Sequence, residues 1–184
     1  MRCTSNFIQD RRGATAVEFA LVGTMFLMTL LFILVTAAIL YINQVLDYAT
    51  TRASRQIMTG STQSQATPAT LSSFTQSLCS YLPAVISCSN VVVNLYVVPK
   101  AVQPSGYYGY VKSDMSGLVV PALTPGSGQF NLGTRGDYQY LQVIYPITFL
   151  PSAFAPMLSG GLTYNGKAAY LAISTVAFRN EQYQ

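Results

Sequence analysis

Residues 11–19 read RRGATAVEF, and a long uncharged stretch follows them. Two arginines and a glycine stand at the entrance of this stretch, and one carboxylate, Glu18, stands just inside it. The next charged residue is Asp47, which leaves 28 uncharged residues between the two acids. A helix needs about 20 residues to cross the hydrocarbon core of a bilayer, so this stretch predicts a membrane span.

The position of Glu18 at the mouth of the apolar stretch indicates a function. A carboxylate inside a membrane helix costs roughly 2.5 to 3.5 kcal/mol on insertion scales. A residue that carries such a cost is expected to have a positive partner, because pairing makes a buried charge tolerable.

This arrangement resembles the cleavage motif of type IV prepilins, and the longer stretch resembles the TadE-like family of minor pilins. In that motif a glycine ends a short basic leader, a dedicated peptidase cuts after it, and glutamate is the fifth residue of the mature chain. The resemblance implies cleavage between Gly13 and Ala14, with Glu18 in the fifth position. Phe19 follows the glutamate where the Flp-type pattern has tyrosine, which is a departure from the pattern.

The resemblance implies a role in the tight-adherence (Flp) pilus, in adhesion and in biofilm formation. The expected partners are the bacterial inner membrane, the prepilin peptidase, the major Flp pilin and a sister minor pilin, which would make a hetero-oligomer. No cofactor is expected. The end of the chain, Arg179-Asn180-Glu181, also resembles TadE-like proteins, which often close with a strand and an Arg-x-Glu element.

The basic residues around the span predict its orientation. Arg2, Arg11 and Arg12 precede the span, and by the positive-inside rule they keep that end in the cytoplasm. Arg52 and Arg55 follow the span and weaken this bias. We therefore expect a single-pass protein whose C-terminal domain lies in the periplasm, and outside the cell after pilus assembly.

The composition excludes several classes of protein. Only 9% of the 184 residues are charged, far below the roughly 25% of an ordinary soluble domain. The net charge of +4 is modest, and no basic patch interleaved with aromatic residues suggests nucleic acid. Without the leader and span, about 130 residues remain, which is enough for one small domain.

Cys79 and Cys88 are expected to form a disulfide in an oxidising periplasm. The alternative is that they are two unrelated buried thiols. Cys3 lies in the predicted leader on the reducing side, so the odd number of cysteines fits a leader that stays in the cytoplasm or is removed.

The predicted fold is α+β, with a long N-terminal helix packed on a small, mostly antiparallel sheet, as in type IV pilins. The chain divides into a leader at 1–13, a helix at 14–60 and an extracytoplasmic domain at 61–184. After Tyr41 the helix becomes amphipathic, with Val45, Ala49, Ala53 and Ile57 on one face. Asn43, Asp47, Thr50 and Arg55 fall on other faces, and Gly60 is the expected stop.

The segments after the helix alternate between short elements and turns. We expect a linker at 61–70, a helix at 71–82, strands at 91–98, 108–111, 138–149 and 168–178, and a flexible turn region at 126–136. Asn165-Gly166 predicts a tight hairpin between Tyr164 and Lys167. Pro146 places part of its strand at an edge or bulge.

Candidate catalytic residues are scarce. The chain has no histidine, which removes the commonest general base and metal ligand. The acids after the helix, Asp114, Asp137 and Glu181, form no recognisable pair by their spacing, and no metal site is expected. We therefore expect a protein that is not an enzyme. Tyr107, Tyr108 and Tyr110 are expected either to pack on the sheet or to make an adhesive aromatic surface.

Three other interpretations stay open at this point. In the first alternative, the protein is a permanently anchored assembly factor whose leader is never cut. Residues 1–37 are alternatively an ordinary secretory signal, cleaved near Thr36-Ala37-Ala38 to release an adhesin or binding module, although the apolar stretch is long for that. A periplasmic enzyme is the third alternative, and it has no candidate site.

Overall fold

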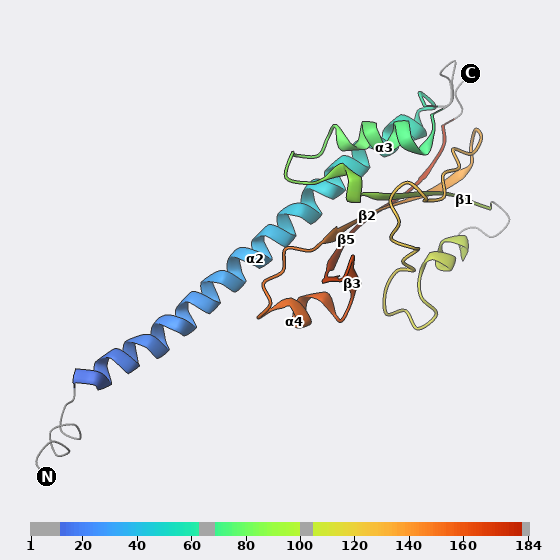
Figure 1. Cartoon of the computed structure of the whole chain (residues 1–184). Helices are drawn as coiled ribbons and strands as arrows, with labels where there is room; N and C mark the ends of the chain where they lie inside the picture. Colours follow the sequence, from blue (N-terminus) through green and yellow to red (C-terminus); the bar gives the residue numbers. More distant parts are fainter. Residues whose placement is uncertain (1–11, 63–68, 100–104, 182–184) are drawn as a thin grey trace, which may run out of the picture. The chain divides into compact units, whose positions relative to one another are not determined.

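The computed structural model describes residues 12–62, 69–99 and 105–181 (Figure 1). The chain forms two compact units, Met1–Ala38 and Ile39–Gln184, and each is described by itself. Arg2, Cys3 and Arg11 lie outside the described residues, as does most of the linker expected at 61–70. The expected α+β class, with a long helix packed on a small antiparallel sheet, is confirmed.

Helix α2 (Arg12–Met58) is the longest element of the chain. Its sequence carries no proline, and its apolar residues favour an uninterrupted helix. The helix ends near the predicted stop, because Gly60 adopts a φ of +75°, a left-handed conformation that favours glycine. The amide of Gly60 donates to the carbonyl of Ile57 over 3.0 Å, which satisfies one carbonyl of the last turn.

The part of α2 after Ile39 buries one face. The side chains of Ala49, Ala53 and Ile57 are fully buried, as the periodicity predicted. Two positions differ from the expectation. Leu46 takes the buried place expected of Val45, which is half-buried. Thr50 is also fully buried, because its hydroxyl donates to the carbonyl of Leu46 over 2.7 Å and leaves no unsatisfied donor.

The main sheet has three antiparallel strands in the order β1–β2–β5. Their bounds are Val92–Val98 for β1, Tyr138–Ile147 for β2 and Tyr170–Arg179 for β5. The last pair between β1 and β2 is Val92 with Ile144. Among the described residues, β5 is therefore the one strand that flanks Pro146, which agrees with the edge position that its missing N–H predicts.

The two faces of the sheet differ in what covers them. On β5, Ala172 and Ser174 are buried, whereas Thr175 and Ala177 on the other face are exposed. Tyr140 of β2 lies on the same face as Thr175. The short 3-10 helix η3 (Ser105–Tyr110) packs over this face, because the ring of Tyr110 stacks on that of Tyr140. The opposite, more apolar face is therefore the one that α2 covers.

Two segments join α2 to the rest of its unit. Figure 1 shows α3 (Leu71–Cys79) lying along the C-terminal part of α2. The hydroxyl of Ser77 on α3 donates to Oε1 of Gln56 over 3.1 Å, and Nε2 of Gln56 donates to the hydroxyl of Tyr81 over 3.2 Å. The amide of Glu181, just after β5, donates to the carbonyl of Met58 over 2.8 Å. The end of β5 therefore lies at the end of α2.

Most of the shorter elements lie where they were expected. The hairpin is confirmed, because Asn165 and Gly166 both have positive φ between β3 (Thr163–Tyr164) and β4 (Lys167–Ala168). The prediction of a strand at 108–111 is wrong: η3 occupies most of it, and only Val111 makes an isolated bridge, to Leu118. The helix α4 (Ala155–Ser159) and the short helix η1 (Cys88–Asn90) were not expected.

Candidate functional site: the N-terminal helix and the surfaces of the domain

The predicted cleavage and assembly residues lie together in the first two turns of α2. Gly13 and Ala14 are both within the helix, and Glu18 follows Ala14 by four residues. Residues four apart on a helix lie on the same face, so Glu18 stands one turn above Ala14. The side chains of Glu18 and Phe19 are exposed, and Phe19 is 78% exposed. The carboxylate is thus accessible to a second molecule at this end of the helix.

The residues that follow form an apolar surface that their own unit does not bury. The segment 15–58 contains the one helix among the described residues that is long and apolar enough to cross a membrane. Seven of the most exposed apolar side chains in its first half are Val17, Leu21, Val22, Met25, Phe26, Leu27 and Ile33. Exposed apolar side chains on this scale indicate contact with lipid or with other apolar helices.

A hollow of about 400 Å³ lies on this surface over Gly23. It is lined by Phe19, Val22, Phe26 and Leu27. Nothing lies within 4 Å of the place where a side chain of Gly23 would begin, so the missing side chain leaves the space open. Hollows of this kind accept a side chain of a neighbouring helix, because small residues let helix backbones approach closely.

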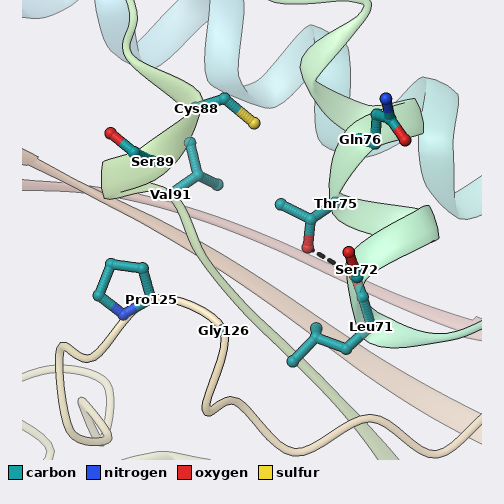
Figure 2. Close-up of a pocket in the computed structure, with 9 residues that line it drawn as sticks. All are labelled: Leu71, Ser72, Thr75, Gln76, Cys88, Ser89, Val91, Pro125 and Gly126. Atoms are coloured by element: carbon teal, nitrogen blue, oxygen red, sulfur yellow. Dashed lines mark hydrogen bonds between the residues drawn. The ribbon is translucent and has the colours of Figure 1, made fainter.

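The expected disulfide is present. Cys79 and Cys88 are joined, with their Cα atoms 5.9 Å apart, so the bridge ties the end of α3 to η1. Beside the bridge lies an open pocket of about 560 Å³. Figure 2 shows Thr75 and Gln76 of α3 on one side of it, Ser89 and Val91 on the other, and Pro125 on a separate loop.

The walls of this pocket are uncharged. Its lining offers hydroxyl and amide groups without a carboxylate or a basic side chain. One of those hydroxyls is already used, because Thr75 donates to the carbonyl of Leu71 over 2.7 Å. The lining therefore places no carboxylate or basic side chain beside its hydroxyls.

Two acids of the domain, Asp114 and Asp137, accept hydrogen bonds within turns. The carboxylate of Asp114 accepts from the amide and the hydroxyl of Ser116, and the bond from that amide is the main reason why the pKa of Asp114 is lowered. The carboxylate of Asp137 accepts from the amide and the hydroxyl of Thr134. Within the described ranges, no three His, Cys, Asp or Glu side chains are placed to hold a metal ion.

The tyrosines at 107, 108 and 110 do not act as one surface. The ring of Tyr110 stacks on Tyr140 at 4.3 Å between centroids and lies 5.1 Å from the ring of Tyr96. Tyr108 is 65% exposed, and Tyr107 is half-buried. Packing on the sheet is therefore the role of Tyr110, and only Tyr108 stands out into solvent.

The buried Tyr140 makes the stability of the domain depend on pH in the alkaline range. Burial, with smaller contributions from Tyr110 and Tyr96, raises the pKa of Tyr140 to about 12. An unfolded tyrosine has a pKa of about 10. The folded state therefore favours the neutral phenol, and this contribution to stability is complete below pH 10 and is lost as the pH rises towards 12.

We expect the melting temperature of the full-length protein to fall between pH 10 and 12, and to fall less in Tyr140→Phe. The hydroxyl of Tyr140 is buried without a hydrogen-bond partner, so its removal should leave the stability at pH 7 unchanged or slightly higher. Thermal unfolding followed by circular dichroism at several pH values checks this. An identical alkaline decrease in both proteins would show that other groups cause it.

Helix α2 resembles a known protein family. Residues 13–55 match the model of the TadE-like protein family. The resemblance that the sequence predicted is thereby confirmed, and the match begins at Gly13 and contains Glu18, Phe19 and the apolar surface. Resemblance to the TadE-like family implies that this protein is associated with the Tad pilus machinery.

The TadE-like match ends within α2, so the sheet, the disulfide and the pocket lie outside it. Comparisons with curated proteins and with solved structures gave no match.

Proposed function

We propose that this protein is a minor pilin of a tight-adherence (Flp) pilus, which primes assembly or caps the filament tip. One observation carries the proposal. Glu18 lies five residues after Gly13, at the head of a TadE-like helix whose apolar side chains are exposed over several turns. The role is structural rather than catalytic.

Cleavage after Gly13 would make Ala14 the new N-terminus. The freed amine would then be a positive group at the end of the helix, and Glu18 of a neighbouring subunit would pair with it. Such a pair stabilises each charge in an apolar surrounding and fixes the axial register of the two helices. In the membrane the same helix would be held by lipid before assembly, with the domain in the periplasm.

The folded domain supports the role of a minor subunit. By the resemblance, major Flp pilins are little more than the helix, whereas this chain adds a disulfide-bonded sheet domain. The extra domain therefore argues against the role of the bulk subunit. It is compatible with a few positions, such as the tip, where adhesion would also take place.

N-terminal sequencing of the membrane-extracted protein tests this function. We expect the mature chain to begin at Ala14 in cells that contain the prepilin peptidase, and at Met1 in cells without it. A start at Met1 in both strains would favour a permanently anchored assembly factor. A start near Ala38 would identify a secreted binding module and overturn the filament role.

A further inference from the structure

One end of the domain is uncharged and exposes large apolar side chains. No Asp, Glu, Lys or Arg occurs from Tyr138 to Gly166. The segment 148–166, which contains α4 and is here called the α4 tip, leaves Phe149 52% and Met157 74% exposed. Only Ala155 of α4 is buried, so the helix is anchored weakly and presents most of its surface outward.

The α4 tip lies at the end of its unit that is farthest from Met58. Since Glu181 bonds to Met58, β5 ends at that level, and the stretch from Tyr170 to Glu181 covers roughly 36 Å at about 3.3 Å per residue. The stretch of α2 from Ile39 to Met58 covers roughly 29 Å at 1.5 Å per residue. Figure 1 shows α4 beside the start of β5, at the end of the sheet away from the C-terminus.

The α4 tip therefore lies level with the beginning of this part of α2, where the apolar stretch of the sequence is ending. If the apolar stretch of α2 crosses a bilayer, as the proposed function requires, the chain leaves the membrane close to Ile39, and the α4 tip is the part of the domain level with that residue. Its residue types suit that position. Aromatic and methionine side chains enter the boundary between headgroups and acyl chains, and the exposed Lys167 beyond the tip suits lipid phosphates.

We propose that the α4 tip is a second membrane contact, in which Phe149 and Met157 enter the headgroup boundary of the phospholipid bilayer that α2 spans. The inference rests on the proposed membrane-bound state but not on pilus assembly. The contact would hold the domain against the membrane, and extraction into a filament would have to release it.

Single tryptophans test this contact, since the chain has no tryptophan of its own. Full-length Met157→Trp is reconstituted in vesicles of phosphatidylethanolamine and phosphatidylglycerol, with or without bromine on the upper acyl chain. Met115→Trp is the matched control. Met115 is also an exposed methionine, with 68% of its surface exposed, and it lies on a loop that follows η3. The helix η3 packs on Tyr140, near the end of β2 that is opposite the α4 tip. Phe26→Trp in the apolar surface reports the span itself.

We expect brominated lipid to quench the tryptophan at position 157 at least about twofold more than that at position 115, because interfacial segments bury their apolar side chains about 5 to 10 Å into the boundary. A second outcome is that position 26 is quenched while positions 157 and 115 are quenched equally and weakly. That outcome would overturn the lipid contact and leave the membrane span in place. A blue-shifted but unquenched signal at 157 would also overturn it, because a protein surface would then cover the tip. No quenching at position 26 would overturn both the contact and the membrane-bound state.

Discussion

Glu18→Ala is expected to abolish the pili that depend on this protein, while the protein still inserts into the membrane. Removing one partner of a buried charge pair costs about 3 to 5 kcal/mol, because the other charge is left without compensation. A loss of that size lowers the association constant of two helices by a factor of more than about 100. Pilus counts by electron microscopy and co-purification of the partner pilin measure the effect.

Asp47→Ala is the matched control for this experiment. Asp47 is the next acid along α2 and is also exposed, but it follows the apolar stretch and lies outside the segment expected to pack in the filament core. We expect normal pili from the control. Normal pili and normal co-purification from Glu18→Ala would refute the pairing mechanism and leave Glu18 without a role in assembly.

Loss of the disulfide is expected to have the second largest effect. The double variant Cys79→Ala, Cys88→Ala should lose about 2 to 3 kcal/mol of unfolding free energy, since the bridge closes a short loop in the unfolded chain. The bridge also holds α3, whose Phe74 and Leu78 are buried and whose Phe74 ring lies 5.5 Å from that of Phe130. Loosening of α3 should therefore expose part of the core.

Urea unfolding of the full-length protein in detergent, with and without reductant, measures this loss. A reductant should destabilise the wild-type domain and leave the double variant unchanged. Cys3→Ala is the control, because Cys3 lies outside this bridge and its replacement should leave the midpoint where it is. Equal midpoints for the wild type and the double variant would show that the bridge does not stabilise the domain.

The parts of the fold that depend on local sequence were predictable. The Asn165-Gly166 turn requires two residues with positive φ, and these residue types supply them. Alternation along 138–147 indicated β2, and the spacing of Ala49, Ala53 and Ile57 indicated the buried face of α2. The motif around Gly13 and Glu18 predicted the family match. Cleavage at Gly13 and pairing of Glu18 with an amine stay predictions.

The parts that depend on distant contacts were not predictable. Tyrosines and Val111 suggested a strand at 108–111, but stacking of Tyr110 on Tyr140 favours η3 there. Thr50 looked like a solvent-facing residue, because the sequence does not show that its hydroxyl bonds within the helix. The α4 tip was missed altogether, although Pro156 in the first turn of α4 was a usable signal for a helix start.

The hydrogen bond between Met58 and Glu181 has a consequence for the order of events during export. In a chain that is exported from its N-terminal anchor outward, α2 is in place long before residues 170–181 have been translocated. The central strand β2 needs β5 as a neighbour, and the end of α2 needs Glu181, so neither can reach its final state earlier. If the chain is exported in this way, as the proposed function requires, the domain folds late, and until then the half-exported subunit would be held by its membrane helix and would be open to periplasmic proteases and chaperones.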